Sequence, residues 1–307
     1  MRTTHRDYAE EAGDFHRLAR LLTDDIDHVR AHTTWCVGRL ADWKYGLWGD
    51  KPSTPRFCER NAHLWFDALG DLGAVAISEE GGPQVVVLTT RGHRFLFEEA
   101  LAWVVGNWGE RGTLSVEITE AATVEAAALE RSGFRQVSVF HAYTFDLARP
   151  LPEAPPLPDG FTLVDMQSQP DYRARRLLRA EAFEGRTDLS EAELARDLDL
   201  DAAWRESPIY HAATDVYVRA PDGRLVAGCE ALIDARNAAA DVERICTHSA
   251  FRRRGLARAA IHDCLRRQRD VGMERAYIAG YSREALALYG SLGAVAERAC
   301  VICRQDS

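Results

Sequence analysis

The amino-acid sequence predicts an α/β protein with a mixed β-sheet, organised as two domains. The chain has 307 residues, more than the ~100–200 residues of one typical domain. A stretch with five prolines, LARPLPEAPPLPDG, covers residues 147–160, and strand-like and helix-like segments alternate after it. Because proline fixes φ and removes a backbone donor, we expect a semi-rigid linker over 149–160. It would separate domains over 1–148 and 161–307.

The second half predicts a strand, two helices, three strands, a helix, a strand, a helix and a strand. Ser190 and Glu193 form the pattern of a capping box at one helix start. Pro221-Asp222-Gly223 lies between two alternating segments and is typical of a hairpin. Only the later helices have the position of crossovers, which favours a mixed sheet. In order, the segments are 161–166, 171–185, 190–204, 210–220, 224–235, 241–248, 255–272, 276–281, 282–293 and 294–304.

Composition and charge limit the classes of function. The chain is 46% hydrophobic and 28% charged, with a net charge of −9, which argues against a general nucleic-acid binder. The sequence contains no run of ~18 apolar residues that would span a membrane. Its start, MRTTHRDYAEEAGDF, has no apolar segment after the basic residues, so we expect no signal peptide and a cytoplasmic protein.

Seven scattered cysteines are typical of reduced thiols and not of a disulfide framework. Cys300 and Cys303 match a CxxC pattern, but they lie in an apolar run, ACVICR, that predicts a strand. Residues three apart on a strand point to opposite faces. We therefore expect core cysteines and no metal site.

A basic turn precedes the helix predicted over 255–272. Here HSAFRRRGLARAA leads from a strand, through Gly255, to a helix N-terminus. The first N–H groups of a helix have no partner within the helix, and its dipole favours negative charge. Glycine lets a ligand approach the backbone closely. The pattern Arg252-x-x-Gly255-x-Ala257 thus predicts a pyrophosphate site, to which Arg258, Arg266, Arg267 and Arg269 could add charge.

Two other interpretations of this turn remain open. A solvated basic helix start would show the same short pattern. Nucleic-acid binding is disfavoured, because the basic run is local and lacks interleaved aromatic residues.

Two motifs in order resemble the GNAT N-acetyltransferase superfamily, over roughly residues 160–305. The Arg252–Ala257 turn resembles the family's Q/R-x-x-G-x-G/A motif, and Ser282–Ala294 resembles its N-x-x-A-x-x-L-Y-x-x-x-G-F motif. Ser282 stands where Asn is usual and Ala294 where Phe is usual. The resemblance implies two GNAT-like domains, each with a mixed, mostly antiparallel central sheet flanked by helices.

The resemblance also implies acetyl-CoA as co-substrate, with no metal. The backbone of the strand before the turn would pair with the pantetheine arm as an added strand does, and the turn would hold the pyrophosphate. The residues expected to bind coenzyme A are Ile245, Cys246, Thr247, Arg252, Arg253, Arg254, Gly255, Leu256, Ala257, Arg258 and Ser282.

Two catalytic residues are implied as well. Tyr289 would protonate the departing thiolate, since a phenol is a donor with a pKa of ~10; otherwise it is a buried helix aromatic. Glu243 would accept the amine proton, directly or through water; the alternative role for Glu243 is an ion pair with Arg244 or Arg236.

Glu243 precedes Ile245 by two residues, so we expect both side chains on one face of the strand and Cys246 on the other face, in the core. His248 is expected to be a loop or capping residue.

The first half resembles a degenerate copy of the same pattern. Segments 83–105, 113–119 and 123–147 repeat the strand and helix order, with Gly133 in the place of Gly293. However, the turn TTRGHRF lacks R-x-x-G-x-A, and Leu129 falls in the place of Tyr289. We therefore expect no catalysis and weak acetyl-CoA binding in this half.

The predicted function is transfer of an acetyl group from acetyl-CoA to a primary amine of a small molecule, by direct attack in a ternary complex. Two alternatives remain: acetylation of a protein amine, and a catalytically silent acyl-CoA-binding or interaction module. We expect no nucleic-acid or membrane partner, and the sequence leaves monomer and homodimer open. The acceptor is not predicted, since fold does not determine function.

Overall fold

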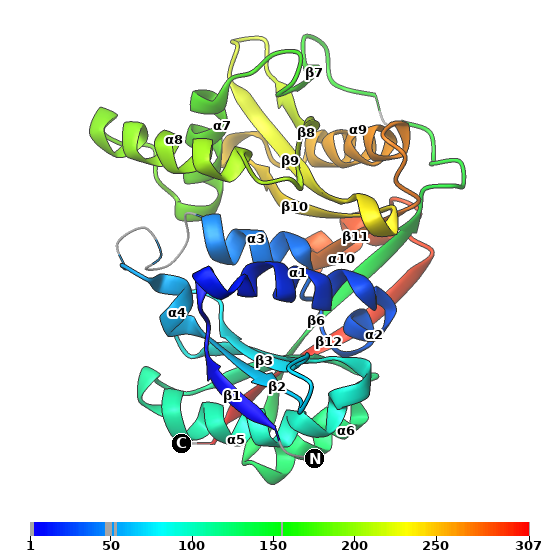
Figure 1. Ribbon diagram of the computed structural model, residues 1–307. Helices are drawn as coiled ribbons and strands as arrows, with labels where there is room; N and C mark the ends of the chain where they lie inside the picture. Colours follow the sequence, from blue (N-terminus) through cyan, green and yellow to red (C-terminus); the bar gives the residue numbers. More distant parts are fainter. Residues whose placement is uncertain (1–2, 47–50, 52–53, 155, 307) are drawn as a thin grey trace. The chain divides into compact units, whose positions relative to one another are not determined.

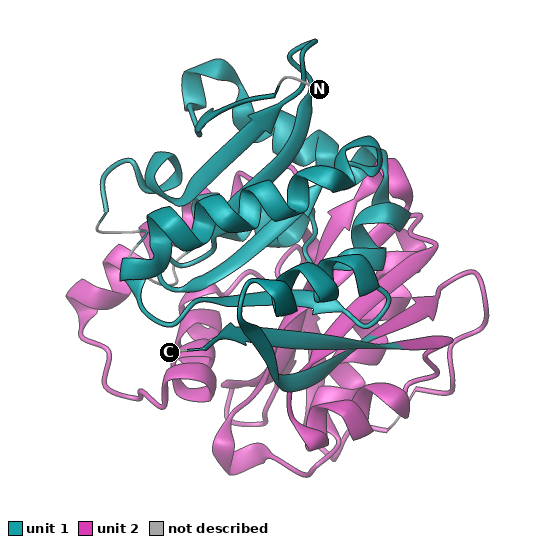
Figure 2. Cartoon of the chain, turned by 90° about the horizontal axis from the view of Figure 1, so that it is seen from below, with its two compact units in different colours: residues 1–142, 298–307 teal, residues 143–297 magenta. Residues whose placement is uncertain are grey.

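The computed structural model describes residues 3–46, 51, 54–154 and 156–306 (Figure 1). It contains two compact units (Figure 2): unit 1 comprises residues 1–142 and 298–307, and unit 2 comprises residues 143–297. The C-terminal strand belongs to unit 1 from Arg298 onward. The units therefore do not coincide with the predicted domains over 1–148 and 161–307, whose limits stay a prediction.

Unit 2 contains the first nine elements predicted for the second half, in the predicted order, whereas the last predicted strand lies mostly in unit 1. A π-helical turn over Ala180–Glu184 follows directly on the first helix. Its helices are α7 (Tyr172–Arg179), α8 (Glu191–Arg205), α9 (Leu256–Asp270) and α10 (Arg283–Gly290). Its strands are β7 (Thr162–Asp165), β8 (Tyr210–Arg219), β9 (Leu225–Asp234), β10 (Ala239–Thr247) and β11 (Arg275–Gly280).

Local sequence signals account for several boundaries in unit 2. Ser190 and Glu193 form the predicted capping box at the start of α8. The Ser282 side chain accepts a hydrogen bond from the Ala285 N–H and caps α10. Gly272, at the end of α9, adopts the left-handed φ of 89° that terminates helices. The predicted capping box at Ser190 is confirmed.

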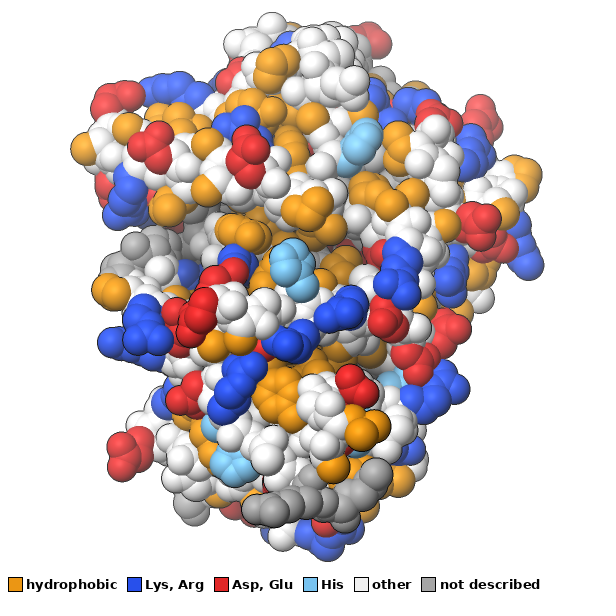
Figure 3. Space-filling view, in the orientation of Figure 1, with side chains coloured by type: hydrophobic (Ala, Val, Ile, Leu, Met, Phe, Trp, Pro, Cys, Tyr) orange, Lys and Arg blue, Asp and Glu red, His pale blue; other side chains and the backbone are white. Residues whose placement is uncertain are grey.

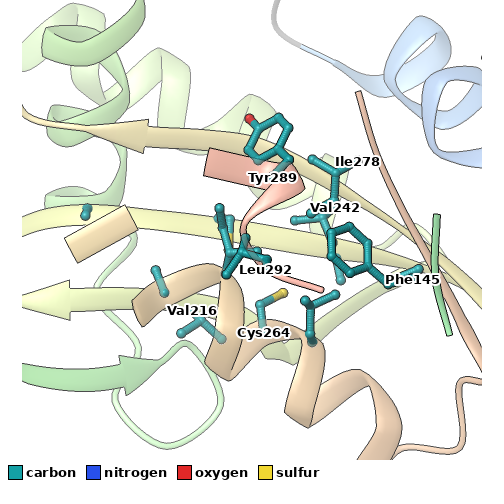
Figure 4. Packing of buried hydrophobic residues seen from close by; sticks show 14 of the residues in the cluster. Phe145, Val216, Val242, Cys264, Ile278, Tyr289 and Leu292 are labelled. Atoms are coloured by element: carbon teal, nitrogen blue, oxygen red, sulfur yellow. The ribbon is translucent and has the colours of Figure 1, made fainter. Parts of the chain in front are cut away.

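The sheet of unit 2 has the order β11-β10-β9-β8-β7. All neighbouring pairs are antiparallel except β10 with β11, which is parallel, so the predicted mixed sheet is confirmed. Helices α7 and α9 cover opposite faces (Figure 1). Beneath α9 and α10 lies the largest hydrophobic cluster of unit 2, which includes Phe145, Val242, Ile278 and Tyr289 (Figure 4).

The proline-rich segment is attached to unit 2 in its described part. Leu151 and Leu157 pack against the α9 cluster, and the Pro152 carbonyl accepts a hydrogen bond from His262 at 2.7 Å. The leucines of this segment bury apolar surface between the prolines, and the semi-rigid linker over 149–160 stays a prediction. Pro155, within the predicted linker, lies outside the described residues.

Unit 1 combines a mostly antiparallel sheet with helices on both faces, and its strand order is β1-β2-β3-β4-β5-β12. The strands are β1 (Thr4–Asp7), β2 (Ala62–Phe66), β3 (Leu72–Ser78), β4 (Gln84–Thr89), β5 (Ser115–Thr119), β6 (Phe134–Asp146) and β12 (Ala296–Gln305), the last two reaching into both units. The helices are α1 (Asp14–Asp24), α2 (Ile26–His32), α3 (Val37–Tyr45), α4 (Phe57–Asn61), α5 (Phe97–Trp108) and α6 (Thr123–Arg131).

Alternate residues of the unit 1 strands pack into two separate hydrophobic cores, one on each face of the sheet. Ala74 and Ala76 of β3 belong to the cluster beneath α5 and α6. Val75 and Ile77 belong to the cluster beneath α1 and α3. This alternation follows from the period-2 geometry of a strand. It gives unit 1, like unit 2, helices on both faces of its sheet.

All seven cysteines are free thiols. Cys303 belongs to the α5–α6 cluster, and burial, with a contribution from Glu117, raises the pKa of Cys300 to about 12. Both CxxC thiols are thus buried in β12, as predicted.

On the face drawn in Figure 3, basic and acidic side chains are both scattered among hydrophobic and neutral ones. In the part of the chain that the structure describes, no helix is long and apolar enough to cross a membrane.

Candidate functional site

The site begins where β10 and β11 separate. Their parallel pairing joins Ala239–Asp241 to Arg275–Tyr277, whereas the antiparallel pairing of β10 with β9 continues to Thr247. The second half of β10 therefore turns one backbone edge toward an opening in the sheet. An edge of this kind can pair with an extended ligand.

A groove of about 1090 Å³ occupies this opening. It is formed by the end of β10, the basic turn, the start of α9, helix α10 and the π-helical turn after α7. Its lining residues are Ala182, Phe183, Ile245, Cys246, Thr247, Phe251, Arg252, Arg253, Gly255, Leu256, Ala257, Arg258, Ser282, Arg283, Glu284, Ala285, Ala287, Leu288 and Tyr289.

The basic turn exposes the N-terminus of α9 to this groove. Gly255 is the N-cap residue, with a left-handed φ of 78°. Glycine has no side chain to cap the first-turn N–H groups, and a Cβ at this position would meet no atom within 4 Å. Arg252 and Arg253 at the rim are exposed. Open N–H groups, a helix dipole and nearby guanidinium groups together suit a phosphorylated ligand.

Tyr289 lies at the edge of the α9–α10 cluster, with its hydroxyl pointing away from the other labelled side chains (Figure 4). Its ring packs against Gly280, where a Cβ would come within 2.8 Å of Cε2. It also contacts the Tyr143 ring edge-on, with centroids 6.2 Å apart. Burial, then Cys229 and Glu243, raise the pKa of Tyr289. The hydroxyl is therefore a protonated donor at neutral pH.

Glu243 does not share a face with Ile245, contrary to our expectation. Glu243 pairs with Glu230, which receives a hydrogen bond from Arg179 of α7. Ile245 packs against the opposite, α9 cluster. The cause is an irregularity in β10 between Glu243 and Cys246, which interrupts the alternation of side chains. Glu243 and Cys246 consequently lie on the same face, although Cys246 is buried as predicted.

Residues 173–294 match the acetyltransferase (GNAT) family model. This part of the chain is a GNAT domain. A comparison with curated proteins gave no match.

Solved structures resemble the chain along nearly its whole length. A GCN5-related N-acetyltransferase from Sphaerobacter thermophilus is 20% identical, with a TM-score of 0.65, over 99% of this chain and 95% of that one. A tandem GNAT protein from the clavulanic acid biosynthesis pathway is 14% identical, with a TM-score of 0.63, over 100% and 99%. An acetyltransferase from Colwellia psychrerythraea is 9% identical, with a TM-score of 0.57, over 99% of each chain.

At these identities the likeness is one of fold, and it covers both halves of the chain. The predicted architecture of two GNAT-like domains is thereby confirmed. The matched family is one of acetyltransferases, so residues 173–294 form an acyl-CoA-dependent N-acyltransferase domain.

The groove of the GNAT domain brings together most residues that the sequence singled out. Two of the predicted residues, Arg254 and Glu243, are not among the residues that line the groove. The Arg254 guanidinium group lies over the Phe251 ring, 5.2 Å from the ring centroid. Those that line the groove are Ile245, Cys246, Thr247, Arg252, Arg253, Gly255, Leu256, Ala257, Arg258, Ser282 and Tyr289.

Sequence reasoning missed the side of the groove formed by Ala182 and Phe183. Both lie in the π-helical turn, which no local pattern distinguished from the end of a helix. Arg283 and Glu284 were also missed, although the cap at Ser282 places them in the first turn of α10. The cap was therefore a usable signal.

Two predicted sources of positive charge are engaged elsewhere. Arg266 pairs with Asp263 and Asp270, and Arg267 pairs with Asp165 and Asp263. Neither lines the groove. Arg258 does, and it donates a hydrogen bond to Ser291. His248 accepts a hydrogen bond from the Ala250 N–H, which confirms a capping role.

The equivalent opening in unit 1 is filled by the chain itself. Strands β4 and β5 are parallel over Gln84–Val85 and Ser115–Val116, as β10 and β11 are. Beyond this pairing, His28 of α2 lies 3.1 Å from the Thr89 carbonyl through its Nε2, and the Thr34 N–H donates to Glu117 of β5. The cavity between α2 and these strands has a volume of only about 10 Å³, and a separate pocket of about 400 Å³ lies beside His28 and the turn Thr90–Gly92.

Within the described residues, no group of three or more His, Cys, Asp or Glu side chains is placed to hold a metal ion.

The glycine turn can be tested by Gly255→Glu, which places a side chain and a negative charge at the helix N-terminus. We expect calorimetric titration to show loss of coenzyme A binding, because like charges repel at the proposed phosphate position. The protein should remain folded, since a Cβ at Gly255 meets no atom within 4 Å and the cost is confined to backbone strain at the positive φ.

Gly272→Glu is the matched control, because Gly272 has a similar φ of 89° and equally open surroundings at the other end of α9. It carries the same backbone strain but lies away from the groove lining. Retained affinity in folded Gly255→Glu, or equal losses in both variants, would exclude this turn as the binding site.

Proposed function

We propose that the protein transfers the acetyl group of acetyl-CoA to a primary amine of a small molecule, by direct attack in a ternary complex. The observation that supports this function best is the groove, which is bordered by the open edge of β10, the Gly255 turn and Tyr289. Its residues fit coenzyme A: backbone groups of Ile245–Thr247 suit the pantetheine arm. The N–H groups from Arg253 to Arg258 suit the pyrophosphate.

In this proposal Tyr289 gives its proton to the departing sulfur. Its raised pKa supports the role, because the proton is held until charge develops on the thiolate. Glu243 accepts the amine proton, directly or through water.

Direct transfer is supported by the state of Cys246, the cysteine in the groove lining. Burial raises the pKa of its thiol to about 12. A nucleophilic cysteine acts as the thiolate, so Cys246 is unsuited to carry an acetyl group between two half-reactions.

We also propose that the protein is located in the cytoplasm, which the seven free thiols support.

The basic test is thiol release from acetyl-CoA, measured with a panel of small primary amines and with a lysine-containing peptide. We expect turnover with at least one small amine. Turnover only with the peptide would favour the protein acceptor, and binding of acetyl-CoA without any turnover would favour the silent module.

The stoichiometry of binding should be one coenzyme A per chain. The unit 1 opening is filled by α2 and the residues after it, and Leu129 lies buried in the place of Tyr289. Calorimetric titration of the intact chain checks this expectation. Two equivalent sites would contradict the assignment of unit 1 as a non-binding copy.

Cys246→Ala should retain turnover of the same order as the wild type, because the sulfur takes no part in direct transfer. Steady-state kinetics with a cognate amine measures this, and mass spectrometry of the enzyme with acetyl-CoA alone should show no added acetyl group. An acetylated wild-type enzyme together with an inactive variant would instead establish a covalent route.

Tyr289→Phe keeps the ring and its packing but removes the proton donor. We expect turnover to fall by about 10²–10⁴-fold, in kcat and kcat/KM together. Coenzyme A affinity should barely change, because the hydroxyl acts as charge grows on sulfur. Since the pKa of Tyr289 is raised, wild-type turnover should not decline through ionisation of this group below pH ~10.

Tyr143→Phe is the matched control: its hydroxyl bonds to Glu297 at 3.1 Å, and its ring packs beside Tyr289 without lining the groove. This variant should keep near-normal turnover. Full activity in Tyr289→Phe, or equal losses in both variants, would remove Tyr289 from the mechanism.

A further inference from the structure

The irregularity in β10 is a bulge of one residue. Glu243 pairs with Glu230, and the next pair is Cys246 with Gly228. Arg244 and Ile245 therefore stand opposite the single residue Cys229. A bulge bends its strand and increases the local twist. The direction in which the Ile245–Thr247 backbone reaches the groove thus depends on this bulge.

The bulge contains a strained backbone conformation. Arg244 has a left-handed φ of 51°, which side chains with a Cβ disfavour. Such a conformation persists only where surrounding contacts hold it.

Contacts with Glu230 and Trp204 help to hold Arg244. Its guanidinium forms an ion pair with the Glu230 carboxylate, and it lies over the Trp204 ring, 4.7 Å from the centroid. The planar guanidinium group suits both contacts at once, because it can donate in its plane and stack on an aromatic face.

Both anchors of Arg244 are fixed by burial. Glu230 is fully buried and also receives a hydrogen bond from Arg179 Nη2 at 3.0 Å. Trp204, near the end of α8, is 2% exposed. The contacts therefore tie the bulge to α7 and α8, on the face of the sheet opposite α9.

We propose that Arg244 is a positioning residue for acyl-CoA: its contacts with Glu230 and Trp204 lock the bulge that sets the backbone of Ile245–Thr247 for the pantetheine arm. This inference rests on the proposed function, since it assumes that the β10 edge pairs with that arm. Arg244 itself does not line the groove, and it acts only through the backbone that follows it.

If Arg244 holds the bulge in place, its loss should affect the binding of two ligands differently. Coenzyme A uses both the β10 edge and the Gly255 turn, whereas ADP carries the pyrophosphate without the pantetheine arm. Loss of the lock should weaken coenzyme A and leave ADP unchanged. A general loosening of unit 2 would weaken both.

The experiment is calorimetric titration of the full chain with coenzyme A and, separately, with ADP, using wild type and Arg244→Gly. Glycine tolerates the positive φ, and Glu230 keeps Arg179 as a partner, so the variant should fold. We expect coenzyme A affinity to fall about 10- to 30-fold, as for two lost backbone hydrogen bonds, with ADP affinity unchanged.

Ala238→Gly is the matched control, because Ala238 also has a positive φ of 48° and lies just before β10, away from the groove. It should leave both affinities unchanged. Arg244→Lys, which keeps a cation beside Glu230 but loses the planar group over Trp204, should give a smaller loss for coenzyme A. This second variant also serves if Arg244→Gly proves unstable.

Unchanged coenzyme A affinity in the Arg244 variants, or a parallel loss of coenzyme A and ADP, would overturn the positioning role. A wild-type protein that binds no coenzyme A would instead contradict the proposed function, on which this role rests. The wild-type titration therefore separates the two failures.

Discussion

The separation of β10 from β11 is the constraint on which the site depends. A strand has two hydrogen-bonding edges. One edge of β10 pairs with β9 as far as Thr247, whereas the other edge pairs with β11 only over Ala239–Asp241. The groove lies in the opening that follows. The Gly255 turn and helix α10 come directly after these two strands in the chain, so the same opening receives both the helix N-terminus and Tyr289.

Buried backbone groups require hydrogen-bond partners, and the two units meet this requirement differently. In unit 1, His28 contacts the Thr89 carbonyl and the α2 region fills the opening between β4 and β5. In unit 2 the corresponding edge borders an open groove. One architecture thus provides an internally filled copy and a copy suited to an external ligand, which is the physical basis for proposing a single site.

Burial has the same effect on two groups of the groove. It raises the pKa of both Tyr289 and Cys246, which keeps each of them protonated at neutral pH. For a tyrosine this preserves a proton donor, and for a cysteine it removes a nucleophile. The same environment therefore favours proton transfer from the phenol and disfavours a covalent cysteine intermediate.

By itself the sequence determined the order of elements in unit 2, the caps at Ser190 and Ser282, the glycine turn at Gly255 and most of the groove lining. Those features follow from neighbouring residues: helical spacing, capping side chains and a positive φ that glycine allows. Only the tertiary structure decided the faces of Glu243 and Ile245, the pairing of β12 with β5, and the filling of the unit 1 opening by α2. These depend on strand register and on contacts between residues far apart in the chain, for which a local pattern carries no signal.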